Sequence, residues 1–191
     1  MLHDPCRIIA HRGASAYAPE NTMAAFRKAV QLGAPEVETD VGFTKDRALL
    51  LLHDRTLERT TSGSGRPEDH DLAYLKTLDA GSWMDPREHP DFDWQQDYSG
   101  ERLITLDELL AEFGDALTYH VEIKDRTAGL VPAIIDSVMG YGLLSQVIMA
   151  MVDDEDPLLE AKSLAPGIRT SLAPNAVMKQ HGPEEAVRRV A

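Results

Sequence analysis

The sequence predicts an α/β protein with a mostly parallel sheet that is covered by helices. Short apolar runs alternate with amphipathic stretches along most of the 191 residues, and such strand–helix alternation is typical of parallel sheets. The length fits one domain, given the usual size of about 100–200 residues. The alternation is interrupted once, between residues 54 and 102. A stretch of this length with little regular structure usually indicates an inserted functional lobe.

The first part of the chain contains three predicted strands and one helix. The strands are apolar runs bounded by turn-forming residues, at residues 7–10, 37–43 and 49–52. The helix has apolar residues at three- and four-residue spacing and ends near Leu32, before Gly33. Asn21 or Thr22 can cap its first amide groups.

After residue 102 the strand–helix pattern resumes. Strands are expected at residues 117–123, 146–151 and 168–172. Helices are expected at residues 105–113, 131–139, 156–164 and 183–190, with Thr105 as the cap of the first. Within the interrupted stretch the pattern predicts a short helix at residues 72–78.

Three predicted strands carry polar side chains where packing alone would favour aliphatic ones. These side chains are His11 and Arg12 at the end of the first strand, Glu38 and Asp40 on one face of the next, and His120, Glu122 and Lys124 on one face of a later strand. An unpaired buried carboxylate is costly, and three that converge repel one another unless a cation lies between them. We therefore predict that Glu38, Asp40 and Glu122 bind a divalent cation. Carboxylate oxygens favour Mg²⁺ or Ca²⁺, with Mn²⁺ as a further candidate.

The turn at residues 44–47 predicts a strand register. If Phe43 pairs with Ala48, then Glu38 lies opposite His53. This register places His53 on the same face as the carboxylates, beside the predicted cation. A bulge in the turn would reverse that placement.

Each of these signals has a simpler explanation when it is taken alone. A Glu-x-Asp pair on a strand is often solvated, Lys124 can be a surface lysine, and His120 can be an interior histidine with a satisfied hydrogen bond. The segment Gly63–Gly65 lacks the context of a phosphate-binding loop and is interpreted as a flexible turn. Only the combination favours a functional site.

The charge balance and the single cysteine restrict the partners. There are 19 Lys and Arg against 32 Asp and Glu, a net charge of −13, so neither nucleic acid nor an anionic membrane is an expected partner. Cys6 cannot form an intrachain disulfide, which suits a reducing compartment. With no signal peptide and no apolar run long enough to span a bilayer, we predict a cytoplasmic protein without an integral membrane segment.

In this order, the motifs resemble those of the glycerophosphodiester phosphodiesterase family. The matching segments are His11–Ser15, Pro19–Thr22, Glu38–Asp40, Thr44–Asp46, His53–Asp54, Leu57–Thr61, Leu75–Trp83, Thr105–Leu109 and Val121–Lys124. The resemblance is dense over residues 8–125 and thin over residues 146–172.

The resemblance implies a TIM-type (β/α) barrel, with a site at the carboxyl ends of the strands and a small capping insert at about residues 55–103. It also implies metal-dependent hydrolysis of a small-molecule glycerophosphodiester to glycerol phosphate and an alcohol. By position, the family's residues correspond to His11 and His53 as the acid/base pair, Glu38, Asp40 and Glu122 as metal ligands, and Arg12 and Lys124 as phosphate contacts. Glu20 and Asn21 match the opening motif, where a supporting role is expected.

The resemblance stops before the end of the chain. Nothing after Ala173 resembles the last two strands of the family's barrel, and a closed barrel typically takes about 250 residues. We therefore expect one domain over residues 1–191 whose barrel is incomplete at the C-terminal end. An open edge of this kind calls for a partner chain such as a homo-oligomer, a swapped element, or a longer parent protein.

Two other functions fit the same motifs. One is a catalytically weakened phosphodiester-binding or assembly protein that keeps the metal site. The other is a sphingomyelinase-D-like lipid phosphodiesterase, against which the insert at residues 54–102 argues.

Overall fold

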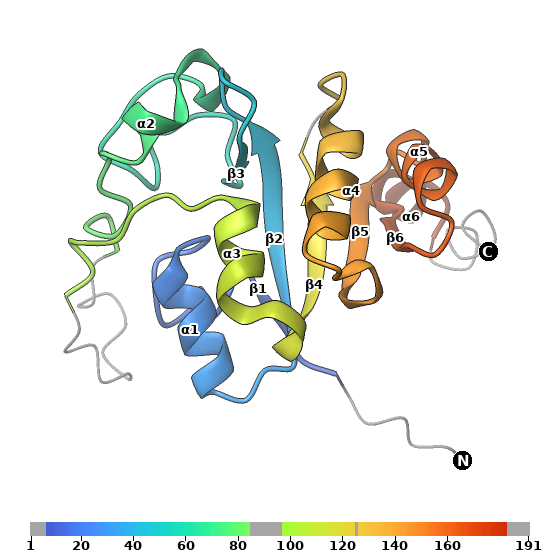
Figure 1. Ribbon diagram of the computed structural model, residues 1–191, viewed down its shortest axis with the longest axis horizontal. Helices are drawn as coiled ribbons and strands as arrows, with labels where there is room; N and C mark the ends of the chain where they lie inside the picture. Colours follow the sequence, from blue (N-terminus) through green and yellow to red (C-terminus); the bar gives the residue numbers. More distant parts are fainter. Residues whose placement is uncertain (1–6, 85–96, 125, 183–191) are drawn as a thin grey trace.

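The sheet is built mainly from parallel strands that follow one another in chain order (Figure 1). The computed structural model describes residues 7–84, 97–124 and 126–182. The parallel strands lie in the order β1 (Ile9–His11), β2 (Glu36–Phe43), β4 (Thr118–Ile123), β5 (Val147–Val152) and β6 (Arg169–Ala173). A short strand, β3 (Leu49–Leu51), pairs antiparallel with β2. Consecutive parallel strands joined by helices form the wall of a (β/α) barrel.

Helices that connect these strands cover one face of the sheet, where α1, α3 and α4 lie in front of it in Figure 1, whereas α2 lies in the insert and α6 follows the last described strand. The helices are α1 (Met23–Gln31), α2 (Leu72–Leu75), α3 (Leu106–Phe113), α4 (Leu130–Gly140), α5 (Asp156–Leu164) and α6 (Asn175–His181). Single 3₁₀ turns occur at Pro67–Asp69, Gly114–Ala116 and Leu144–Gln146.

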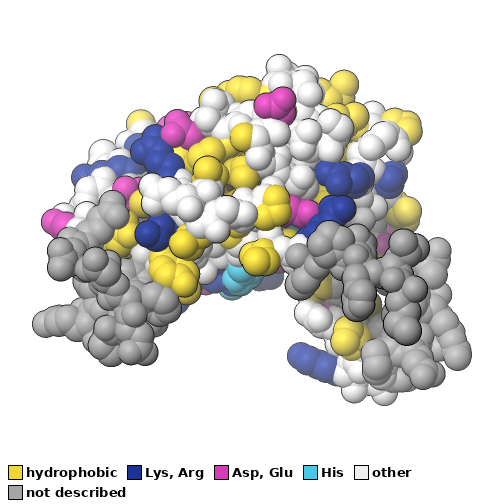
Figure 2. Space-filling view, turned by 90° about the horizontal axis from the view of Figure 1, so that it is seen from below, with side chains coloured by type: hydrophobic (Ala, Val, Ile, Leu, Met, Phe, Trp, Pro, Cys, Tyr) yellow, Lys and Arg dark blue, Asp and Glu magenta, His cyan; other side chains and the backbone are white. Residues whose placement is uncertain are grey.

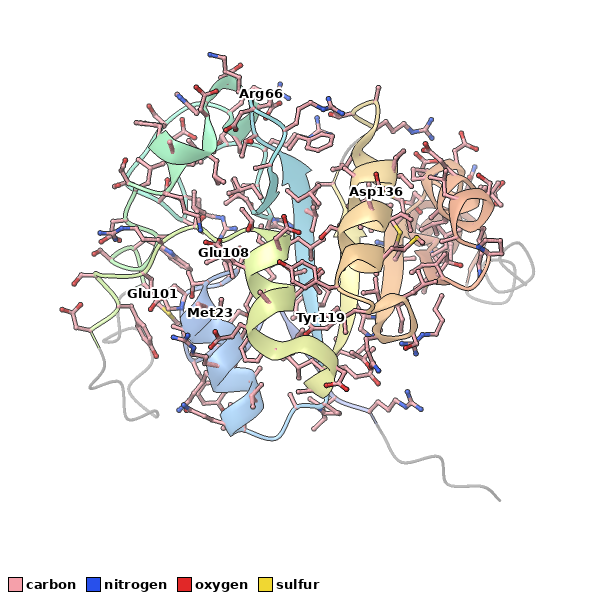
Figure 3. The ribbon with its side chains drawn as sticks, in the orientation of Figure 1. Met23, Arg66, Glu101, Glu108, Tyr119 and Asp136 are labelled. Carbon is pink, nitrogen blue, oxygen red and sulfur yellow. The ribbon has the colours of Figure 1, made fainter. Side chains whose placement is uncertain are left out.

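Both predicted helix caps are confirmed. The Thr22 hydroxyl accepts a hydrogen bond from the Ala25 amide at the start of α1. Thr105 and Glu108 form a reciprocal capping box at the start of α3, where Figure 3 labels Glu108. The predicted helix at residues 183–190 lies outside the described residues, and α6 was not predicted.

The main hydrophobic core lies between the helices and the outer face of the sheet. Its largest members are fully buried, and they include Phe26 of α1, Leu109 of α3, Ile134 of α4 and Tyr119 of β4. The Tyr119 hydroxyl, labelled in Figure 3, donates to the Gly114 carbonyl at 2.7 Å, which satisfies its polar end.

The inner face of the sheet is open to one side. Within the described residues, β1 and β6 each pair with a single neighbouring strand. The inner-face residues of β6, Arg169, Ser171 and Ala173, are exposed. In Figure 2, which views the molecule from below Figure 1, the side chains of the described residues curve around one hollow side. The fold is a TIM-type barrel whose wall is incomplete at the C-terminal end.

The insert has a hydrophobic cluster of its own. Its members are Leu50, Leu52, Leu57, Leu75, Leu78, Ala80 and Leu103. Its two ends meet at β3, because the Leu51 amide donates to the Ile104 carbonyl at 2.9 Å. The predicted short helix inside it is confirmed as α2, although it ends at Leu75 rather than at Leu78.

The predicted register of the β2–β3 hairpin is wrong by one residue. Phe43 pairs with Leu49 rather than with Ala48. The turn is closed by the Thr44 amide, which donates to the Ala48 carbonyl, and Arg47 adopts a left-handed conformation with φ of 63°. A three-residue loop that ends in a left-handed residue forms a bulge, so the parity is reversed. Leucines, rather than His53, therefore follow the inner face of β3.

Among the described residues, no helix is both long enough and apolar enough to cross a membrane.

Candidate active site

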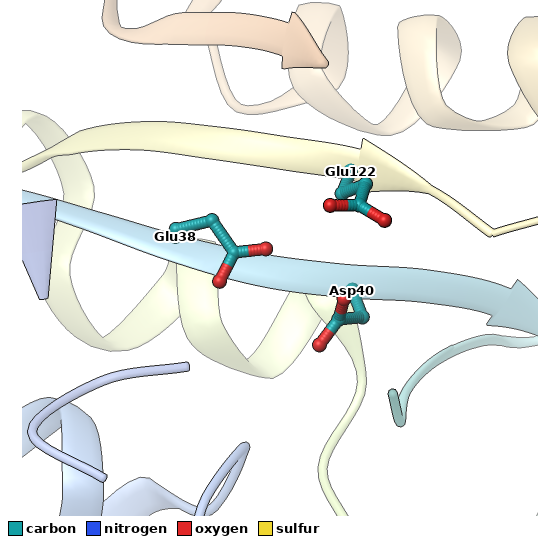
Figure 4. Close-up of side chains that lie close together, drawn as sticks. All are labelled: Glu38, Asp40 and Glu122. Carbon is teal, nitrogen blue, oxygen red and sulfur yellow. The ribbon is translucent and has the colours of Figure 1, made fainter. Parts of the chain in front are cut away.

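Three carboxylates converge on the inner face of the sheet, two from the middle of β2 and one from near the carboxyl end of β4 (Figure 4). Glu38 and Asp40 both lie on β2, and Glu122 lies on β4 directly beside Asp40. Each offers one oxygen within 4.8 Å of the others. Side chains alternate between the two faces of a strand, so two parallel strands in register produce this cluster without a specialised loop.

The cluster fits a hard divalent cation. Glu38 Oε1 is buried and accepts no hydrogen bond from a described residue, whereas the buried Asp40 Oδ1 has the Lys124 ammonium as its partner. Burial and the neighbouring charge of Asp40 raise the pKa of Glu38 to about 7. A cation between the carboxylates would give the Glu38 oxygen a partner and relieve the repulsion among the three groups. Oxygen donors of this type suit Mg²⁺, Ca²⁺ or Mn²⁺.

Two cationic side chains border the carboxylates. Lys124 Nζ lies 2.8 Å from Glu122 Oε1 and 3.1 Å from Asp40 Oδ1. Burial opposes its charge, but the two carboxylates more than compensate and raise its pKa. Arg12 donates to Glu20 at 2.9 Å, and its Nε lies 3.5 Å from Asp40 Oδ2. Lys124 therefore belongs to the site and is not a separate surface lysine.

The loop after β1 brings Arg12 and Asn21 to the carboxylates. Both residues adopt left-handed conformations, with φ of 57° and 55°, which is uncommon for side chains other than glycine. Between them, Gly13 has φ of 77°, and a Cβ there would approach the Ala25 carbonyl carbon to 2.7 Å. The loop thus requires glycine where it packs against α1.

Asn21 fixes the position of Asp40. Its Nδ2 donates to Asp40 Oδ2 at 3.0 Å, and its Oδ1 accepts from the Thr39 hydroxyl at 2.9 Å. All three side chains are buried. Glu20, the second residue expected to support the site, contacts Arg12 instead.

The two histidines differ in their contacts. His11 Nε2 lies 3.8 Å from Glu38 Oε2, and partial burial together with the charge of Arg12 lowers the pKa of His11. His53 Nδ1 lies 2.7 Å from Asp54 Oδ1. The charge of His53 also acts to lower the pKa of His11.

A cavity of about 610 Å³ adjoins the site between the barrel and the insert. Its lining includes His53 and Lys124 from the site, and Phe43, Arg55 and Arg66 farther away. Figure 3 shows Arg66 in the insert, beyond the carboxyl ends of the strands. The cavity thus reaches both Lys124 and His53 of the site.

The structure brings together the nine residues singled out from the sequence, and it adds three that sequence reasoning missed. The additions are Thr39, Asp54 and Arg59, each of which lies within one of the matching segments but was given no role of its own. The alternative interpretation of His120 is confirmed, because its Nε2 lies 2.6 Å from Glu36 Oε2. His120 is a satisfied interior histidine.

The fold and the carboxylate cluster define a TIM-type barrel protein with a polar site at the carboxyl ends of its strands. The chain is similar to a phosphodiesterase of Oleispira antarctica solved in complex with the product sn-glycerol-3-phosphate, with a TM-score of 0.79 and 30% identity over 97% of this chain and 70% of that one. The profile of the Glycerophosphoryl diester phosphodiesterase family matches residues 11–133. The chain belongs to this family.

Two curated relatives support the same assignment. The chain is 38% identical over 179 residues to the glycerophosphodiester phosphodiesterase of Bacillus subtilis, covering 88% of this chain and 60% of that protein. It is 36% identical over 169 residues to the glycerophosphodiester phosphodiesterase of Caldanaerobacter subterraneus subsp. tengcongensis, covering 86% of this chain and 65% of that protein. The chain thus spans less than two thirds of the length of these relatives.

Proposed function

We propose that this protein hydrolyses glycerophosphodiesters to glycerol phosphate and an alcohol, in a reaction that depends on a divalent cation. The observation that carries the proposal is the cluster of Glu38, Asp40 and Glu122, in which the buried Glu38 Oε1 accepts no hydrogen bond from a described residue. Family membership supports it, as does the product-bound relative.

Glu38, Asp40 and Glu122 would hold the cation, with Asn21 fixing Asp40. A bound divalent cation supplies Lewis-acid polarisation of a phosphoryl oxygen. Arg12 presents a planar fork and Lys124 a point charge to the phosphate. The Arg12 and Lys124 side chains lie beside the carboxylates, where their positive charges would attract an anionic substrate to an otherwise acidic protein.

His11 and His53 would transfer the protons. One deprotonates the attacking oxygen and the other protonates the leaving alkoxide, a task that suits imidazole near neutral pH. The nucleophile is either the glycerol 2-hydroxyl, which gives a cyclic phosphate that water then opens, or water itself. The lowered pKa of His11 favours its neutral form, which is able to accept a proton.

The deciding experiment is incubation with glycerophosphocholine and glycerophosphoethanolamine, with and without Mg²⁺, Ca²⁺ or Mn²⁺. Metal-dependent release of glycerol phosphate that is abolished in His11→Ala and Glu38→Ala supports the proposal. Tight binding of these compounds without turnover would favour a phosphodiester-binding protein. Turnover of sphingomyelin in place of glycerophosphodiesters would favour the lipid phosphodiesterase.

Two architectural proposals accompany the activity. The segment at about residues 55–103, with its own hydrophobic cluster and its ends joined at β3, serves as a capping insert within one barrel domain.

A second copy of the chain would cover the open edges at β1 and β6. Sedimentation velocity over a range of concentrations tests the second copy. The cytoplasmic location stays a prediction.

A further inference from the structure

Arg59, in the insert, binds two carboxylates from different parts of the chain. Its Nη1 and Nη2 donate to Glu20 Oε2 and Oε1 at 2.9 and 2.7 Å. Its Nε and Nη2 donate to Asp54 Oδ2 and Oδ1 at 2.5 and 2.9 Å. A single guanidinium thus makes a two-pronged contact with each carboxylate, an arrangement that fixes direction as well as charge.

Each of these carboxylates also contacts one residue of the proposed active site. Asp54 Oδ1 lies 2.7 Å from His53 Nδ1, and Glu20 Oε1 accepts from Arg12 Nη1 at 2.9 Å. The contacts therefore form one continuous chain from His53 through Asp54, Arg59 and Glu20 to Arg12. His53 and Arg12 lie 41 residues apart in sequence, yet both are held through Arg59.

The charge of Arg59 fixes the protonation of this chain. Hydrogen bonds from Arg59 and then from His53 hold the pKa of Asp54 well below its usual range. An ionised carboxylate can only accept hydrogen bonds, so His53 Nδ1 carries the proton and Nε2 remains the nitrogen that can act on a substrate. Glu20 also has a lowered pKa, because the hydrogen bonds and charges of Arg59 and Arg12 outweigh the opposing effect of its burial.

An exposed ion pair alone would contribute little to stability, because solvent screens the two charges. Arg27 provides the comparison: it also donates through two nitrogens, to Glu112 at 2.8 and 2.7 Å, and neither residue belongs to the site. Arg59 differs because both of its partners contact site residues and because it lies over the Trp83 ring, 6.0 Å from the centroid. We infer that Arg59 is a positioning residue that aligns His53 and Arg12 together and couples the insert to the reaction.

Because this role serves the hydrolysis proposed above, the first test measures turnover of glycerophosphoethanolamine by the metal-loaded protein. Arg59→Ala is expected to lower kcat/KM by about 10- to 100-fold, the usual cost of losing an orienting partner. Millimolar guanidinium should restore part of this loss, since the Arg59 side chain is 44% exposed. Urea, a neutral molecule of similar shape, should restore none. Arg27→Ala is the matched control and should stay within about twofold of wild type.

A second test needs no turnover and so remains decisive if the proposed function fails. Ring ¹⁵N chemical shifts of His53, assigned with His53→Gln, should report one tautomer with Nδ1 protonated in the wild type and in Arg27→Ala. Arg59→Ala and Arg59→Lys should give a mixture of tautomers. The inference is overturned if His53 keeps a single Nδ1-protonated tautomer in both Arg59 variants, or if kcat/KM of Arg59→Ala stays within about twofold of wild type.

Discussion

The strands β1, β2 and β4 and the strands β5 and β6 form two parts of one wall with different inner faces. The first part carries the three carboxylates, His11 and Lys124. The second presents Ile148, Ala150 and Val152 on β5 and exposed Arg169, Ser171 and Ala173 on β6. The charges of the proposed chemistry are thus concentrated in the first three parallel strands and the adjoining insert. The last two strands extend the sheet without adding to the carboxylate cluster.

The largest expected effect comes from the two histidines next to the first three parallel strands. His11→Ala and His53→Ala should each lower kcat for glycerophosphodiester hydrolysis by about 10²- to 10⁴-fold, because each removes a proton-transfer group. Steady-state kinetics with saturating metal measures this loss. His70→Ala is the control, since His70 lies in the insert, where its ring is tilted against Tyr74 and its Nε2 lies 3.2 Å from the Ser64 carbonyl. An equal loss in His70→Ala would contradict a specific role.

A smaller effect is expected from the residue that holds Asp40. Asn21→Ala removes the hydrogen bond to Asp40 Oδ2 and should weaken divalent-cation binding by about 10- to 100-fold. Isothermal titration with Mg²⁺, Ca²⁺ and Mn²⁺ measures the change. Asn175→Ala, in the exposed first turn of α6 beyond β6, should leave the affinity unchanged. Equal affinities for Asn21→Ala and the wild type would show that Asp40 is positioned without Asn21.

The affinity of the first part of the wall for a divalent cation should depend on pH. The Glu38 pKa of about 7 lies above the ordinary value of 4.5, so its contribution to folding is present below pH 4.5 and is lost as pH rises to about 7. A cation must displace that proton, so its affinity should be roughly tenfold higher at pH 8 than at pH 6. Thermal shift and proton release on titration with Ca²⁺ measure this effect. Glu38→Gln should remove the pH dependence, and an affinity independent of pH in the wild type would contradict it.

The smallest effect is expected on the second part of the wall. Ser171 lies on the inner face two strands away from Glu122, which pairs with Ala150 between them. Ser171→Ala should change kcat/KM by less than about twofold, within the usual range for surface substitutions. A loss of tenfold or more in the same kinetic assay would mean that the site extends onto β6 and would remove the contrast between the two parts.

The sequence predicts the carboxylate cluster well because its geometry follows from alternation. Glu38 and Asp40 share a face whatever the neighbouring strand does, and Glu122 joins them once β4 pairs with β2 in parallel. The hairpin register was not predictable in the same way, because one left-handed residue, Arg47, reverses the parity. Arg59 lies in the matching segment Leu57–Thr61, but the sequence assigned it no role, since its partner Glu20 lies 39 residues away.

The strand β3 belongs to two hydrophobic clusters at once. Leu49 and Leu51 pack into the main core, whereas Leu50 packs among the leucines of the insert. Unfolding of the insert would therefore expose one face of β3. Unfolding of the barrel would in turn remove Leu50 from the hydrophobic cluster of the insert. Amides of the two parts should exchange with solvent with similar protection, as one cooperative unit. Such a result would make the insert thermodynamically part of the barrel, rather than an independently folding lobe.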